Sequence, residues 1–386
     1  MKKDIFIYYL FSFLLGFYIA NGTTVLFERE LGFSYQQVFV LAAFYMLMFI
    51  IFEVPSGAMA DLLGRKKTMA LGCFVLAVGA VASGLSENFW QLFLSFFLWA
   101  FGFSCISGAD EALIYDRLKD EKEYTRVWGR AHFFFLIAMA LAGILGPMLY
   151  AENFRYPYLF SAIPFFVAGI VIQFFSKEEV KGTFTLREHI NQIKTGAKFA
   201  FHNKYILWAM GVLALTFAVW YNLSNSYQPF LVGVGFTIRD FSWILPAIFV
   251  SEAAGGFFAG KFIERLGERK IFVFGFLLFG LSVGLAGHLG LKLSVVFLLA
   301  YSFLLGILRT TISTYANRHI ESSHRATVIS FQGMMATISA ALSLFLFGFL
   351  TDRIGLANLF ILLGALTVVG GILLLIFRPK EEQPLP

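Results

Sequence analysis

Five ionisable side chains stand inside long apolar runs of this chain, where an uncompensated charge is costly. They are Glu53, Asp110, Glu111, Glu252 and Arg309. Such a group is retained where it meets an opposite charge, binds a solute or carries a proton. The four carboxylates are therefore candidate proton-binding groups, and Arg309 is a candidate for holding an anionic group. Arg309 could also pair with Asp110 across a central cavity. The alternative is a permanent ion pair that braces the fold, which for Arg309 is a pair with Glu252 within the C-terminal half.

The composition indicates that these runs lie in a lipid bilayer. Of 386 residues, 59% are apolar and only 14% are charged. A soluble globular protein carries roughly 45–50% apolar and about 25% charged residues. The composition therefore excludes an ordinary soluble enzyme, a disordered chain and a nucleic-acid-binding domain.

Twelve apolar runs are long enough to cross a bilayer, which takes roughly 20 residues. We expect an all-α integral membrane protein built from two pseudo-symmetric six-helix bundles, residues 1–176 and 204–378. A polar cytoplasmic linker, 177–203, joins them, and 379–386 form a tail. The expected spans are 4–27, 35–60, 68–86, 90–117, 127–150, 157–176, 204–227, 238–262, 270–289, 292–317, 326–350 and 356–377.

The distribution of Lys and Arg predicts that both termini lie in the cytoplasm. With that orientation the inner loops collect most of the basic residues, as membrane proteins generally do. In the linker, Thr185 and Glu188 stand at the spacing of a capping box, and apolar residues follow at helical spacing. This pattern predicts an amphipathic helix on the cytoplasmic surface. It serves either as a tether or in gating.

An internal repeat connects the two halves. The segment that follows the second span carries Gly, an acid, Gly and Lys in the same register as the segment that follows the eighth. Equivalent loops in two six-helix halves indicate duplication about an axis along the membrane normal. The paired residues, each 203 positions apart, are Gly57 and Gly260, Asp61 and Glu264, Gly64 and Gly267, and Lys67 and Lys270.

At these residues the sequence resembles the major facilitator superfamily, whose signature loop is Gly-x-x-x-Asp-x-x-Gly-Arg-Lys. Two further stretches, residues 53–57 and 107–116, look like a bacterial and archaeal permease branch. The resemblance implies a secondary transporter that works by alternating access. Two features of many proton-coupled or antiporting members are missing, because Leu98 replaces an Arg and Tyr150-Ala151 replace a Gly pair.

The resemblance also implies a group of charges that closes the cytoplasmic side. Asp61 and Asp116 are expected to meet Arg65, and Arg130 to pair with Glu53 or Glu111. The alternative is a set of static charges that only fixes the topology. The residues assigned to this gate and signature loop are Gly57, Asp61, Gly64, Arg65, Lys66, Asp116, Arg130, Gly260, Glu264 and Gly267.

Helices one, four, seven and ten line the central cavity in the family's fold, and polar and aromatic residues gather on them. They suit an organic molecule with an apolar body and a few polar groups. An interfacial aromatic belt and helix packing are the alternative explanation. The candidates are Tyr18, Asn21, Asp110, Trp220, Tyr221, Asn222, Asn225, Arg309, Ser313, Tyr315 and Gln332.

We expect proton-coupled export of a small organic or amphiphilic compound across the cell membrane by a monomer. Uptake by symport or facilitated diffusion is the alternative, and a non-transporting sensor or assembly partner belongs to a different class. The sequence shows no catalytic constellation, no metal-ligand spacing and no phosphate loop. We therefore expect no enzyme activity, no cofactor and no metal, no nucleotide or nucleic-acid partner, and a proton gradient as energy source.

Overall fold

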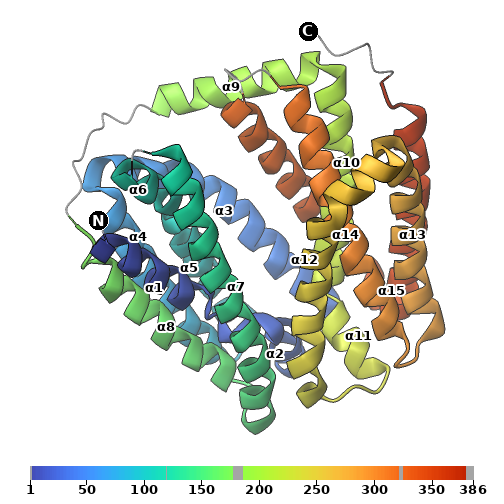
Figure 1. Ribbon diagram of the computed structural model, residues 1–386. Coiled ribbons are helices and arrows are strands. Elements are labelled where there is room, and N and C mark those ends of the chain that lie inside the picture. Colours follow the sequence, from blue (N-terminus) through green and yellow to red (C-terminus); the bar gives the residue numbers. More distant parts are fainter. Residues whose placement is uncertain (1, 119, 177–185, 321–324, 380–386) are drawn as a thin grey trace. The chain divides into compact units, whose positions relative to one another are not determined.

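The computed structural model describes residues 2–118, 120–176, 186–320 and 325–379. Throughout this described part the regular structure is helical (Figure 1). Ten helical stretches are long and apolar enough to cross a membrane, and α8 (Tyr156–Ile172) is a shorter apolar helix. The chain is therefore an all-α membrane protein with many spans.

The chain divides into two compact units. Unit 1 comprises Met1–Arg187 and Thr237–Pro246, and unit 2 comprises Glu188–Phe236 and Ala247–Pro386. The second segment of unit 1 contains η2 (Ile238–Asp240), which packs against α7. The predicted linker, 177–203, stays a prediction in its first part because residues 177–185 lie outside the described residues. Its second part is helical.

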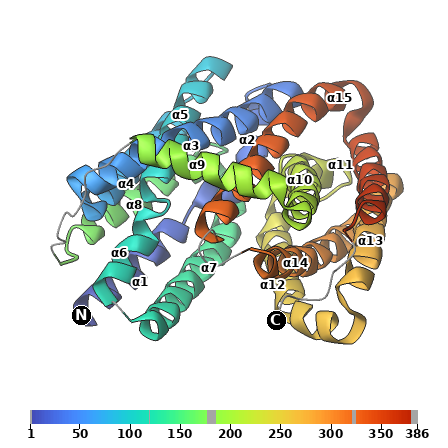
Figure 2. The ribbon, with the colours of Figure 1, turned by 90° about the horizontal axis from the view of Figure 1, so that it is seen from above.

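Unit 1 is a helical bundle in which α4 packs against α5 and α8, and α1 packs against α7 and α8 (Figures 1 and 2). Small residues allow these helices to approach closely. A Cβ at Gly16 of α1 would overlap the carbonyl oxygen of Phe135 in α7. The elements are α1 (Lys2–Gly16), η1 (Ile19–Gly22), α2 (Thr24–Glu30), α3 (Tyr35–Leu63), α4 (Arg65–Gly84), α5 (Phe89–Ile106), α6 (Ala109–Leu118), α7 (Glu121–Glu152) and α8.

Two predicted spans of unit 1 are interrupted. The first consists of α1, the short 3-10 helix η1 and α2. The fourth breaks between α5 and α6, where Gly108 has a φ of +73° that favours glycine. Apolar runs indicate which segments lie in lipid or in the protein core, but they do not indicate whether the helix in such a segment is continuous. The hydropathy pattern therefore predicted both spans and missed both breaks.

Unit 2 has α15 packed against α13 and α10, and α13 packed against α14. The 52 residues of α15 contain two helices merged across Gly355, whose φ of 78° and ψ of 165° are not helical. The elements of unit 2 are α9 (Leu186–His202), α10 (Lys204–Ser224), α11 (Tyr227–Gly233), most of α12 (Phe241–Leu266), α13 (Glu268–Leu289), α14 (Ser294–Arg318) and α15 (Arg325–Ile376).

The two halves of the sequence repeat the same local backbone conformations, as the internal repeat predicts. In each half a glycine with positive φ precedes a capped helix, and a second one joins two long helices. Only residues without a Cβ adopt such φ values without strain. The pairs, each 203 positions apart, are Gly32 (83°) and Gly235 (97°), the capping boxes Ser34–Gln37 and Thr237–Asp240, and Gly64 (94°) and Gly267 (75°).

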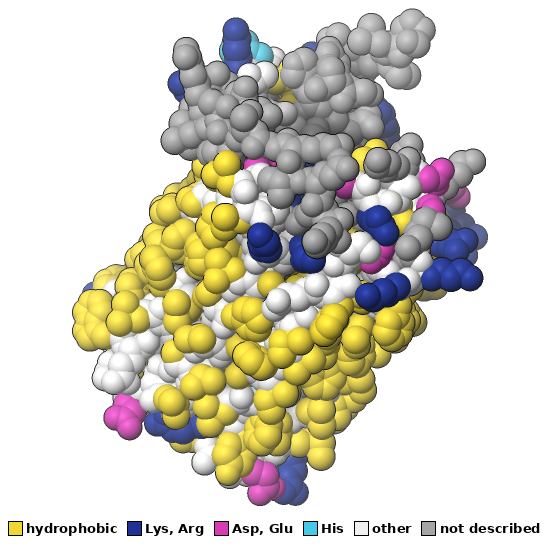
Figure 3. Space-filling view, turned by 90° about the vertical axis from the view of Figure 1, so that its left-hand side faces the viewer, with side chains coloured by type: hydrophobic (Ala, Val, Ile, Leu, Met, Phe, Trp, Pro, Cys, Tyr) yellow, Lys and Arg dark blue, Asp and Glu magenta, His cyan; other side chains and the backbone are white. Residues whose placement is uncertain are grey.

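One face of the molecule shows the composition expected of a membrane protein. Hydrophobic side chains cover its middle, and charged side chains gather near its ends (Figure 3). Large apolar side chains such as Phe257 and Trp90, with 79% and 69% of their surfaces exposed, lie on the outside of the helices. Their exposure is stable in contact with lipid and would be costly in water.

Candidate functional site

Arg309 and Glu252 form an ion pair within the membrane-spanning part of unit 2. The Nη1 of Arg309, on α14, donates to Oε1 of Glu252, on α12, over 2.7 Å. Both side chains are partly buried, with 34% and 25% of their surfaces exposed. This ion pair is the one predicted from the sequence as the alternative to a solute-binding role for Arg309. It also compensates two charges that are costly at membrane depth.

Glycines at the crossing of α12 and α14 position this ion pair. A Cβ at Gly306 would overlap the carbonyl oxygen of Glu252, and one at Gly255 would overlap that of Phe303. The Ser251 hydroxyl donates to the Leu299 carbonyl oxygen over 2.7 Å at the same crossing. The backbones are therefore in direct contact, which brings Glu252 within reach of an arginine on the next helix.

Aromatic rings from α10 cover the Arg309 guanidinium. Its Cζ lies 4.6 Å from the ring centre of Trp220 and 5.3 Å from that of Phe217. The ring centres of Trp220 and Tyr221 are 4.4 Å apart. The ring faces attract the cation, and their edges offer an apolar surface. Unit 2 therefore combines one cation, one carboxylate and an aromatic wall, all from membrane-spanning helices.

Asp110 and Glu111 lie in the first turn of α6, directly after the break at Gly108. Asp110 is partly buried and Glu111 is exposed. The Asp110 Oδ1 accepts from the backbone N–H of Glu111 over 2.7 Å. Unpaired N–H groups and the helix dipole favour negative charge at this position. The break at Gly108 thus places both acids at the start of a helix, which the prediction of one continuous span missed.

On the predicted cytoplasmic side of unit 1, Arg65 joins α4 to α6. Its Nη1 donates to Oδ2 of Asp116 over 2.6 Å and to the Ala112 carbonyl oxygen over 2.7 Å. Lys66 donates to the Phe175 carbonyl oxygen over 3.0 Å, just beyond the end of α8. The predicted contact between Arg65 and Asp116 is present.

Unit 2 has the matching joint with the charges exchanged. Glu268 follows Gly267 just as Arg65 follows Gly64, and it accepts from Arg318 at the end of α14. Arg378 approaches the other Glu268 oxygen to 4.0 Å, with its Cζ 5.4 Å from the ring centre of Tyr315. The sequence analysis did not single out Glu268, although the 203-residue offset from Arg65 points to it.

A second joint of unit 1 was also missed. Asp4 is fully buried and accepts from the Arg117 Nε over 2.7 Å. It also accepts from the Ser176 backbone N–H over 3.0 Å and from the Ser176 hydroxyl over 2.7 Å. These bonds tie the start of α1 to α6 and to the chain after α8. Little in the sequence indicates that Asp4 is buried, because it follows Lys2 and Lys3 at a charged terminus that is expected to face water.

The model of the Major Facilitator Superfamily matches residues 5–237 and 210–386 of the chain.

The chain belongs to this superfamily.

As a superfamily member it is a transporter, and its relatives agree. An uncharacterized MFS-type transporter, YxaM, of Bacillus subtilis is 24% identical, over 98% of this chain and 96% of the relative. The cis,cis-muconate transport protein of Acinetobacter baylyi is 22% identical, over 92% of this chain and 88% of its own. The crystal structure of the nucleoside transporter NupG superposes with a TM-score of 0.80 at 14% identity, over 98% of this chain and 99% of that chain.

Other residues of the superfamily's signature loops take varied positions. Gly64 and Gly267 adopt positive φ before their helices. A Cβ at Gly57 or Gly260 would meet open space. Asp61, Glu264 and Glu53 are exposed in the isolated chain, as is Arg130. The expected pairing of Arg130 with Glu53 or Glu111 stays a prediction.

The predicted cavity residues fall into two groups. Some are buried in helix contacts. Asn222 donates to the Ser343 hydroxyl over 2.9 Å, Tyr315 packs on Trp208, and Gln332 is 4% exposed. The others are at least partly open: Tyr18, Asn21, Trp220, Tyr221, Asn225 and Ser313. Their contacts with solute stay a prediction.

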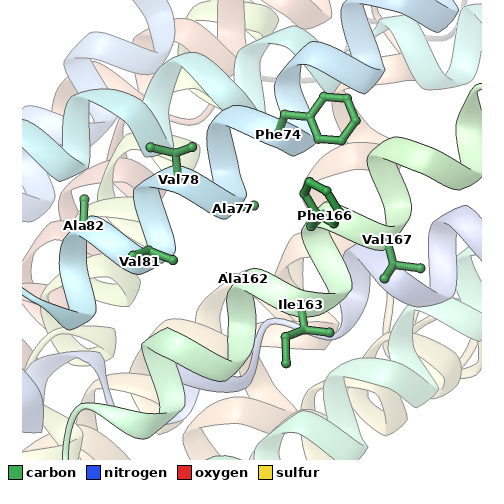
Figure 4. Close-up of a pocket in the computed structure, with 9 residues that line it drawn as sticks. All are labelled: Phe74, Ala77, Val78, Val81, Ala82, Ala162, Ile163, Phe166 and Val167. Atoms are coloured by element: carbon green, nitrogen blue, oxygen red, sulfur yellow. The ribbon is translucent and has the colours of Figure 1, made fainter.

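An apolar hollow on unit 1 offers nothing to orient a solute. It lies between α4 and α8 and is lined by Phe74, Ala77, Val78, Val81, Ala82, Ala162, Ile163, Phe166 and Val167 (Figure 4). Val78, Ile163 and Phe166 are more than half exposed. Specific sites need at least a few placed polar groups. The hollow is therefore part of the hydrophobic outer surface of this superfamily member.

Proposed function

We propose that this superfamily transporter moves a small organic solute by alternating access, coupled to protons. One of the ten described spans, α15, contains two helices, so that with the apolar helix α8 the described residues support a total of twelve spans. The basic residues of the loops support cytoplasmic termini. The proposal places a monomer in the cell membrane.

The Arg309–Glu252 pair carries the coupling proposal. Removing the negative charge of Glu252 by protonation would leave the Arg309 cation without its counter-ion, although the aromatic wall stays in place. A solute with an anionic group then replaces the carboxylate as partner of the guanidinium. When that solute leaves, Glu252 loses its proton and pairs with Arg309 again. Proton and anion are thus bound together and released together, and they cross the membrane in the same direction.

The same observation indicates the class of solute. Trp220, Phe217 and Tyr221 suit an apolar body, and Arg309 suits a single acidic group. An organic acid combines both features. Similarity to a protein named for cis,cis-muconate transport agrees with this class.

The test uses purified protein in liposomes with an imposed pH gradient. A lumenal dye follows the gradient while organic acids, lipophilic cations, sugars and amino acids are added in turn. An organic acid should dissipate the gradient, and Glu252→Gln should abolish this dissipation. Glu152→Gln, which changes an exposed acid at the end of α7, should leave it unchanged. Proton movement with lipophilic cations alone would contradict the assigned class of solute.

Direction is tested in cells, by comparison of a deletion strain with its parent. Export predicts that the deletion strain accumulates the solute and becomes sensitive to it. Loss of growth on the solute as carbon source would instead establish the alternative, uptake. Absence of any solute flux in liposomes would favour a sensor or assembly partner. The carboxylates Glu53, Asp110 and Glu111 are tested as Gln or Asn variants in the same assay.

A further inference from the structure

Glu28 is a buried carboxylate of unit 1 that the proposed site does not use. It lies in α2, and only 3% of its surface is exposed. In the described part of the chain its Oε2 is buried and accepts no hydrogen bond. An ionised carboxylate in such a place is strongly unfavourable unless a cation joins it. The group therefore carries a proton or binds a cation.

The groups around Glu28 favour a proton. The phenols of Tyr18 and Tyr158 interact electrostatically with the carboxyl, and that of Tyr45 with Tyr18. The ring centre of Phe27 lies 4.8 Å from that of Tyr158, so an apolar ring packs against one of these phenols. Phenols donate and accept hydrogen bonds but are poor ligands for metal ions.

Basic side chains near Glu28 in sequence or packing are engaged with the backbone. Arg29 donates to the Phe33 carbonyl oxygen. Arg155 donates to the carbonyl oxygens of Gly84 and Ser86 over 2.8 and 3.0 Å. Among the described residues no group of three His, Cys, Asp or Glu side chains forms a metal site. A proton is thus the cation that fits one carboxyl beside phenols.

The internal repeat shows that packing does not demand a carboxyl here. The helices α2 and α11 have seven residues each and are offset by 203 positions. The position that corresponds to Glu28 is Leu231, which is fully buried at 0% exposure. The fold fills this place with an aliphatic side chain in one half and with a carboxyl in the other. The carboxyl is therefore present for its chemistry.

The interrupted first span places this carboxyl next to a break in a membrane helix. The short helix η1 separates α1 from the seven-residue α2, so α2 is not continuous with the first part of the span. Ion and proton sites in transporters gather at such breaks. We propose that Glu28 is a proton-binding site, which takes up H⁺ as its carboxylate becomes a carboxylic acid and returns it when α2 moves at η1. The exchange with the outer side of the membrane rests on the topology proposed above.

Infrared spectroscopy of the full chain in lipid vesicles, without solute, tests this proposal. The carbonyl band of a protonated carboxylic acid should disappear as the pH is raised and return when it is lowered. Glu28→Gln and Glu28→Leu should both lose one titrating carboxyl. The exposed neighbour Glu30 provides the control, because Glu30→Gln should keep the band.

Three results would overturn the proposal: a carbonyl band that no pH change removes, a titrating band that survives in both Glu28 variants, or no band in the parent protein. If the glutamine variant misfolds, the leucine variant still gives a result, because the equivalent position of the other half holds the buried Leu231. Because no solute is present, the result is separate from the transport proposal. Glu252→Gln should lose coupled flux and keep the Glu28 band.

Discussion

At the scale of single residues, the Arg309–Glu252 pair depends on contacts from three helices. Glu252 comes from α12, Arg309 from α14 and the covering Trp220 from α10. A partly exposed ion pair contributes little to stability by itself. We therefore assign its value to the exchange of partners that transport requires, and we expect its geometry to depend on the glycines beneath it.

Gly306→Ala should disturb this geometry. Its methyl group would overlap the Glu252 carbonyl oxygen, and neither backbone can yield without separating α12 from α14. Overpacking of this kind costs about 1–3 kcal/mol. We expect a lower melting temperature in detergent and slower flux in liposomes. Gly284→Ala in α13, whose methyl group would meet open space, is the control and should match the parent protein.

At the scale of elements, the two halves use the same joint with opposite charges and different burial. In unit 1 the acid, Asp116, is 67% exposed, whereas in unit 2 the acid, Glu268, is only 8% exposed. Arg378, which lies near Glu268, is also buried, at 11% exposure. Burial should make the second joint the one on which stability depends.

Asp116→Asn and Glu268→Gln compare the two joints directly. The first removes an exposed partner and should cost under about 1 kcal/mol. The second leaves a buried guanidinium without its carboxylate and should cost about 1–3 kcal/mol. Thermal unfolding in detergent measures both. Equal shifts of melting temperature would show that burial does not make the contribution of Glu268 to stability larger than that of Asp116.

Gly64→Ala tests the turn between α3 and α4. Gly64 has a φ of 94° and a ψ of 145°, a region that residues with a Cβ rarely adopt. Forcing alanine into it costs about 1–3 kcal/mol. Gly57→Ala, in the same signature loop but with open space around it, should be neutral or slightly stabilising. Thermal unfolding separates the two variants, and an undisturbed Gly64→Ala would contradict the strain argument.

The sequence predicted the elements well and their interruptions poorly. Span positions follow from the apolar runs, and the Arg65–Asp116 contact follows from the signature loop. The break at Gly108 escaped detection because glycine also occurs within continuous membrane helices. Glu28 escaped because it stands one residue beyond the expected end of the first span, where an acid normally faces water. Alignment of α2 with α11 would have placed it opposite a buried leucine.

At the scale of the whole molecule, the resemblance drawn from one loop and its repeat agreed with the family model over both halves of the chain. Duplication explains why so much could be predicted, since each feature of one half indicates a counterpart in the other. The differences between the halves, such as Glu28 against Leu231, could not be predicted from symmetry. We expect solute recognition and coupling to depend on such differences.

Proton-coupled exchange at Arg309 and Glu252 is the central claim. The most direct measurement is organic-acid flux in liposomes with and without a pH gradient, for the parent protein, Glu252→Gln and the control Glu152→Gln, whose acid is exposed at the end of α7. The account predicts that Glu252→Gln loses gradient-driven accumulation by at least about tenfold, equivalent to about 1.4 kcal/mol, while Glu152→Gln retains it. Gradient-driven accumulation by Glu252→Gln at the parental rate would contradict the account.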